Sequence, residues 1–175
     1  MPKYRKMLSD WDVPYIQSLL RLIETQSKTT LINWSVGYAD IVILPLWNKY
    51  YPKDLRPKRA LLAANDWSSR TIRLPEAKDI ILECHKAARE VEDNPVAQAA
   101  ARAIGQCAST IHTPTHCIGL ALYGALAVAY DALGFDAPFA ELEQYAAIEC
   151  GRMYDALKII SIPDEPNPAK LNWNC

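Results

Sequence analysis

The sequence predicts an all-α protein, with about seven helices packed around a central helical hairpin that is rich in alanine and glycine. Alanine dominates residues 60–156 and β-branched residues are sparse there, which is the composition of helices. The chain contains no Asn-Gly pair, the strongest short signal for a β-hairpin. Apolar residues recur at the three- and four-residue spacing of a buried helix face, and prolines and glycines divide them into segments.

The first three predicted helices begin at recognisable signals. Asp12 is expected to cap the first helix, and Pro14 suits its first turn. Residues 27–30 interrupt the apolar pattern and can cap a second helix, which Pro45 is expected to kink because a proline nitrogen cannot donate a hydrogen bond. A turn at residues 54–57 leads into the third helix, which is expected to run to about residue 69.

Prolines and a glycine set the bounds of the other four helices. Pro75 belongs to the first turn of the fourth, and the Asn-Pro pair at residues 94–95 is a strong start for the fifth. Pro114 is expected to interrupt the fifth helix and separate it from the sixth. The remaining boundaries are Gly134, just past the end of the sixth helix, and Pro138, which opens the seventh.

The fifth and sixth helices form the predicted central hairpin. Between residues 94 and 130 the only charged residue, histidines aside, is Arg102, so this stretch is expected to be buried on most of its circumference. Alanines and glycines along it permit close helix contacts. Its most apolar run, residues 118–130, is too short to cross a bilayer, and a buried core helix fits better than a membrane span.

The length of 175 residues predicts one domain with its own core. We expect a helical domain over residues 1–162 and an irregular, proline-rich tail over residues 163–175. The N-terminal residues lack the apolar segment of a signal peptide. Five cysteines without a CxxC pair argue against a disulfide framework and predict a reducing cytoplasm.

The net charge of −1 gives no electrostatic case for binding nucleic acid or a membrane surface. The charge is nevertheless uneven, because residues 1–73 hold 12 basic and 6 acidic side chains and residues 74–175 hold 7 basic and 14 acidic ones. If the two halves form separate faces, this split predicts complementary patches that attract a protein partner or a second copy of the chain. The alternative is that the charges cancel as surface pairs.

His112 and His116 are candidate functional residues because their i, i+4 spacing places two imidazoles on one face of a helix. Two histidines can begin a metal site, but zinc needs three or four ligands and no third ligand follows at a recognisable spacing. We therefore predict no bound metal and no cofactor. The alternatives are a structural role, with the ring nitrogens capping carbonyls freed at Pro114, and contact with a ligand or partner.

Basic residues with an aromatic among them surround the third helix. Arg56 lies at its start, Trp67 lies inside it, and Arg70 and Arg73 follow it. Such a group can bind phosphate or RNA. The alternative is a solvated helix face in which Arg56 pairs with Asp54.

Catalytic motifs are lacking in the sequence. It contains no phosphate-binding loop, no GxSxG and no GxGxxG pattern. Cys84 precedes His85 and Cys117 follows His116, but adjacent residues on a helix point about 100° apart, so neither pair is arranged for cysteine catalysis.

The sequence resembles the immunity-five-like family of putative immunity proteins over about residues 33–160. The residues that carry the resemblance are Asp54-x-Arg56-Pro57-x-x-Ala60, Ala63-x-x-x-Trp67, Ala77, His85-x-Ala87-Ala88-Arg89, Ala97-x-Ala99-Ala100-x-Arg102-Ala103-x-Gly105-x-Cys107-Ala108, His112-x-x-x-His116 and Gly119-x-Ala121-x-Tyr123.

The resemblance implies a bacterial helical protein that accompanies a polymorphic toxin and binds it without catalysis. A protein partner, such as a toxin, is therefore expected, with self-association as a second prediction. The candidate contacts are Arg56, Trp67, His112 and His116. The alternative is a small-ligand binder or an enzyme that uses these four residues in one cleft. The near-neutral charge departs from the strongly acidic character of many toxin inhibitors.

Overall fold

The computed structural model describes residues 4–8 and 11–173, so that Cys175, at the end of the predicted tail, lies outside the described residues. Helices dominate this part of the chain, and the prediction of an all-α fold is confirmed. The helical segments join into seven continuous rods, which are α1 (Pro14–Ile23); α2 (Lys28–Tyr38) with η1 (Ala39–Ile43) and α3 (Leu44–Tyr50); α4 (Arg56–Ser68); α5 (Leu74–Glu90); α6 (Pro95–Ser109); η2 (Pro114–Ile118) with η3 (Leu120–Gly124) and α7 (Ala125–Leu133); and α8 (Phe139–Ile160).

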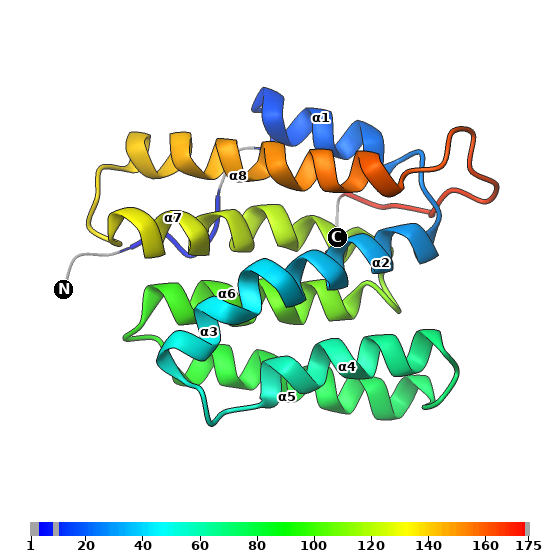
Figure 1. Cartoon of the computed structure of the whole chain (residues 1–175), viewed down its shortest axis with the longest axis horizontal. Coiled ribbons are helices and arrows are strands. Elements are labelled where there is room, and N and C mark those ends of the chain that lie inside the picture. The colour runs from blue at the N-terminus through cyan, green and yellow to red at the C-terminus, as the bar shows by residue number, and fades with distance from the viewer. Residues whose placement is uncertain (1–3, 9–10, 174–175) are drawn as a thin grey trace.

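Helix α6 lies at the centre of the molecule. Figure 1 shows α1 and α8 along one side and the α4–α5 pair along the other, with α6, α7 and the α2–α3 rod between them. Helix α6 packs against α2, α3, α4, α5 and α7, and all its residues except Arg102 and Gln106 are buried. The small side chains of α6 allow these close approaches, as the sequence predicts for the central hairpin.

Two of the predicted helix caps are confirmed. The Ser27 hydroxyl accepts a hydrogen bond from the backbone N–H of Thr30, and the Asn94 side chain accepts one from Ala97. The prediction that Asp12 caps α1 is wrong, because Val13 holds the N-cap position and makes no side-chain cap. Gly134 follows α7 with φ of 87°, a left-handed conformation that glycine adopts without strain.

The prolines change the helices in ways that the sequence did not specify. Before Pro45 the expected kink takes the form of a π-helical turn, η1, which widens the helix where the proline nitrogen cannot donate. Helix α6 ends at Ser109, several residues before Pro114, because Thr113 is extended, with φ of −138°, as residues that precede proline tend to be. Pro114 then begins a 3₁₀ turn.

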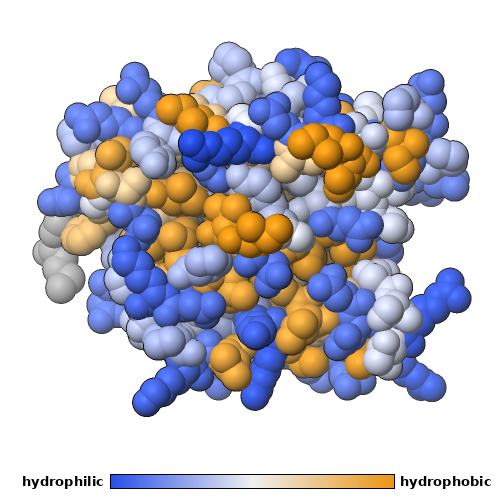
Figure 2. Space-filling model, in the orientation of Figure 1, coloured by the Kyte–Doolittle hydropathy of each residue, from blue (hydrophilic) through white to orange (hydrophobic). Residues whose placement is uncertain are grey.

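Two rods, Lys28–Tyr50 and Pro114–Leu133, are long and apolar enough to cross a membrane by length and composition. In their most apolar windows, 50% and 67% of the residues are buried inside the protein. This burial is what core helices of a globular protein show, and it fits the expectation of a core helix for residues 118–130. Figure 2 shows apolar side chains reaching the surface in groups separated by polar ones.

The chain after α8 folds back along the α1–α2 turn. The Gln26 side chain pairs with the backbone of Ile162, and the Gln26 carbonyl accepts a hydrogen bond from the N–H of Ala169. The Glu165 carboxylate accepts hydrogen bonds of 2.7 Å from the N–H and the hydroxyl of Ser27. The segment is irregular, yet these contacts fix its described part to the helical body.

Candidate functional site

The four residues predicted as contacts do not share one cleft. Arg56 and Trp67 lie near opposite ends of α4, about 16 Å apart along the helix axis at 1.5 Å per residue. Arg56, Trp67 and His116 line three different hollows. The arrangement that the small-ligand and enzyme alternative requires is therefore not formed.

Arg56 joins the start of α4 to the end of α5. Its Nη2 atom lies 2.6 Å from Asp54 Oδ2 and 2.7 Å from Glu90 Oε2, and the expected pairing with Asp54 is confirmed. Hydrogen bonds from Arg56 lower the pKa of both carboxyl groups. Arg56 therefore has a structural role, because it links α4 to α5. Two carboxylates already neutralise its positive charge.

His112 and His116 lie together where the chain leaves α6. Their ring centroids are 6.1 Å apart and the rings are nearly perpendicular. The expectation that their nitrogens cap carbonyls near Pro114 is wrong for Nδ1 of both rings, which is buried without a hydrogen-bond partner among the described residues. Backbone N–H groups already occupy the carbonyl at this break, since those of His112 and Thr113 both donate to Ser109.

The third histidine of the chain, His85 on α5, lies beside this pair. Its ring packs over Gly105 of α6, where a built Cβ atom would lie 2.5 Å from the ring carbon Cε1. Burial lowers the pKa of all three histidines, and for His85 the positive charges of His116, Arg89 and His112 add to the effect. The sequence motifs contain all three residues, but only the packing of α5 on α6 brings His85 to the other two.

These histidines predict a loss of stability at mildly acidic pH. Each folded-state pKa lies below the ordinary value of 6.5, so the unfolded chain takes up protons first as the pH falls through about 6.5. The stabilisation is present above that pH and is lost as the pH falls towards the folded pKa. Carboxylates whose pKa is lowered, such as Asp54 and Glu165, stabilise the fold above about pH 4.5 and lose that contribution only at lower pH, outside the range of the histidines.

The measurement is the melting temperature by circular dichroism between about pH 7.5 and pH 5. We expect it to fall in the wild type and to fall less in the double variant His112→Gln, His116→Gln. An equal fall in both proteins would contradict a role for this pair.

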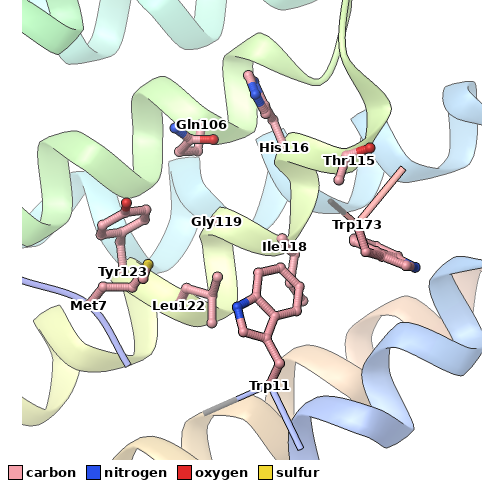
Figure 3. A pocket seen from close by; sticks show the side chains of 10 residues that line it. All are labelled: Met7, Trp11, Gln106, Thr115, His116, Ile118, Gly119, Leu122, Tyr123 and Trp173. Atoms are coloured by element: carbon pink, nitrogen blue, oxygen red, sulfur yellow. The ribbon is translucent and has the colours of Figure 1, made fainter. Parts of the chain in front are cut away.

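His116 is one of the residues that line a hollow of about 470 Å³. Figure 3 shows Trp11 and Trp173 entering it from different segments, with Gln106 and Tyr123 on the opposite wall. The indole centroids are 6.0 Å apart, and Trp173 Nε1 donates to the Glu24 carboxylate. The lining side chains are uncharged: Met7, Trp11, Gln106, Thr115, His116, Ile118, Leu122, Tyr123 and Trp173. Sequence reasoning missed the two tryptophans, because both lie outside the predicted helices.

A second hollow, of about 510 Å³, is strongly basic. It is lined by the first turn of α2, the end of α4 and the turn into α5. Lys28 Nζ lies 4.9 Å from the centroid of the Trp67 ring, and Arg70 and Arg73 complete the charged lining. The sequence pointed to Trp67 and the two arginines but missed Lys28, which lies on another helix. We call this the basic hollow, defined by Lys28, Trp67, Arg70 and Arg73.

The described cysteines lie deep in the core. Cys84, Cys107, Cys117 and Cys150 are buried, and burial raises the pKa of each thiol, to about 12 for Cys150. A thiol held protonated in this way is a poor nucleophile. Cysteine catalysis therefore has no support in this geometry.

A metal ion also has no evident set of ligands. Among residues 4–8 and 11–173, no group of three or more histidine, cysteine, aspartate or glutamate side chains is arranged to hold one. We predict that incubation with a chelator leaves the melting temperature unchanged. A stoichiometric transition metal in the purified protein, lost in a His112→Ala variant, would contradict this prediction.

The fold and its surface define a helical protein with two chemically distinct hollows, one uncharged and one basic. The chain belongs to the Imm-5 like putative immunity protein family, whose family model matches residues 21–156. The match covers the helical core with Arg56, Trp67, His112 and His116, and it confirms the resemblance found in the sequence. A search of curated proteins found no match, and a search of solved structures found none either.

Proposed function

We propose that this chain is a non-enzymatic immunity protein of the bacterial cytoplasm that neutralises a protein toxin by binding it stoichiometrically. The observation that carries the proposal is membership of the immunity family over residues 21–156. The chemistry of the interior supports it, since the described thiols are buried and protonated at neutral pH. Nor is any of the three histidines hydrogen-bonded to a carboxylate among the described residues, as a catalytic imidazole commonly is.

The experiment is co-expression of the chain with the product of a toxin gene found beside its own. We expect the two proteins to purify together at equal stoichiometry, and we expect cells that express the toxin to survive only when the chain is present. A toxin that purifies alone, or cells that die despite soluble chain, would contradict the proposal.

Self-association is a separate prediction that follows from the uneven charge of the two halves. Light scattering at low and at high ionic strength measures it directly, because attraction between opposite charges weakens as salt is added. A mass near 19.6 kDa at every salt and protein concentration would show a monomer and remove the prediction.

Small-ligand binding is a second candidate, favoured by the uncharged hollow beneath Trp11 and Trp173. Ligand sites are typically concave and aromatic with a few polar groups, and here Gln106 and Tyr123 supply those groups. An experiment on the isolated chain distinguishes the two functions. A small ligand that binds in this hollow would quench the fluorescence of these indoles without any toxin present.

A further inference from the structure

The basic hollow is lined by three cations and by no acidic side chain. Lys28, Arg70 and Arg73 line it, and none of the three forms an ion pair with a described residue. Elsewhere on the molecule, Arg56, Lys49 and Arg152 are each neutralised by an acid. Cations placed around a concavity without counter-charges repel one another, and an anion bound between them would relieve that repulsion.

The local positive field extends to the neighbouring histidine. After burial, the charges of Lys78 and Lys28 are among the causes that lower the pKa of His112. At the right-hand end of Figure 1, the start of α2 lies above the α4–α5 turn. The N-termini of α2 and α5 both face this region, and helix N-termini favour negative charge. The charged side chains that line the hollow are all positive, and the two helix ends add to their effect.

Backbone conformation gives Arg70 an unusual position. It follows the end of α4 with φ of 63°, a left-handed conformation in which glycine is the common residue at this point of a helix end. This backbone conformation costs more free energy for an arginine than it would for a glycine. What the arginine supplies is a third cation for the hollow.

The same end of α2 already binds a carboxylate. Glu165 of the C-terminal segment accepts hydrogen bonds of 2.7 Å from the Ser27 hydroxyl and the Thr30 hydroxyl, and its pKa is lowered by these bonds despite the opposing effect of burial. The Ser27 that binds this carboxylate immediately precedes Lys28 in the chain. It shows the kind of anion that this helix end accommodates.

The extent of the positive surface favours a compact anion. Exposed acids border the cations, since Asp66 immediately precedes Trp67 and Glu76 lies three residues after Arg73. A nucleic acid strand needs a basic track along several phosphates, and these carboxylates would repel it at both edges. One or two side chains of an acidic protein loop need only the hollow itself.

We propose that the basic hollow is the docking site for a short acidic segment of the protein partner, whose carboxylates are bound by Lys28, Arg70 and Arg73. This proposal rests on the proposed function, and it names the chemistry of the partner that the hollow receives. Arginine forks match carboxylates in a bidentate manner, and the aliphatic part of the segment would contact Trp67.

The first test uses a fluorescently labelled hexaglutamate peptide and measures its anisotropy at low ionic strength. The double variant Lys28→Glu, Arg73→Glu reverses two charges of the hollow, and both positions lie at helix N-termini, where glutamate is compatible with folding. The matched control Lys53→Glu, Lys58→Glu makes the same change in net charge near the other end of α4.

We expect hexaglutamate to bind the wild type, with an affinity that falls as the salt concentration rises. We expect the hollow variant to bind at least about tenfold more weakly, and the control to stay within about twofold of the wild type. Equal losses in both variants would overturn the proposal, as would absence of peptide binding to the wild type. Tighter binding of a labelled hexathymidylate than of hexaglutamate would also overturn it, in favour of nucleic acid.

Arg70→Gly separates binding from folding. Glycine suits the left-handed conformation, so this variant is expected to melt at a higher temperature than the wild type while binding hexaglutamate more weakly. Unchanged binding in this more stable variant would remove Arg70 from the site.

The second test uses the neighbouring toxin and distinguishes the two proposals. If the wild type and the hollow variant both bind the toxin equally well, the docking site is wrong and the immunity function stands. If neither protein binds it, the immunity function itself fails. The proposed site requires that the wild type binds and that the hollow variant binds at least about tenfold more weakly.

Discussion

Replacing Trp47 by alanine is expected to destabilise the protein by about 3–5 kcal/mol, the usual cost of removing a buried aromatic side chain. Trp47 lies on α3, and its side chain is fully buried in the core. Its ring stacks on Tyr51, with centroids 4.9 Å apart, and its Nε1 atom donates a hydrogen bond of 2.8 Å to the carbonyl of Asp54. The substitution therefore leaves a cavity and also an unpaired carbonyl just before α4.

Chemical denaturation monitored by circular dichroism measures this loss. Ile159→Ala is the control, because Ile159 is 83% exposed and its substitution should change the free energy of unfolding by less than about 0.5 kcal/mol. A loss below about 1 kcal/mol for Trp47→Ala would show that this side chain is not packed as the structure has it.

Replacing Gly119 by leucine is expected to cost about 1–3 kcal/mol through overpacking. Gly119 joins η2 to η3 where this rod presses against α6. A Cβ atom built there meets Cβ of Gln106 and lies 2.7 Å from its Cγ, which are atoms near the backbone that cannot move away easily. Close contact between the two helices of the central hairpin depends on this glycine.

Gly151→Leu provides the matched control. Gly151 lies within α8, and no atom lies within 4 Å of its built Cβ. Because leucine favours a helix more than glycine does, this variant should be neutral or more stable by up to about 1 kcal/mol. If Gly119→Leu melts at the wild-type temperature, the hairpin is not tightly packed at that point.

The sequence predicted the helices well because most carry local signals. Ser27 and Asn94 show their capping role in the residues that follow them, and a nearly uncharged stretch with small side chains marks the centre of a helical fold. The form that a helix takes at a proline is harder to foresee. The π turn before Pro45 packs near η3, and that contact joins residues far apart in sequence.

The candidate site was only partly predictable for the same reason. Trp67, Arg70 and Arg73 are close in sequence, and their grouping was visible. Lys28 joins them only because α2 packs beside α4, and Trp173 reaches Trp11 only because the C-terminal segment folds back over the α1–α2 turn. Long-range packing of this kind leaves no local pattern in the chain.

We propose that this protein acts by binding a toxin, and the mass of the complex in a purified mixture tests this most directly. Light scattering on the chain mixed with the toxin encoded beside its gene should show one species that contains one copy of each protein. Two separate species, with the chain at 19.6 kDa and the toxin still active, would contradict the account.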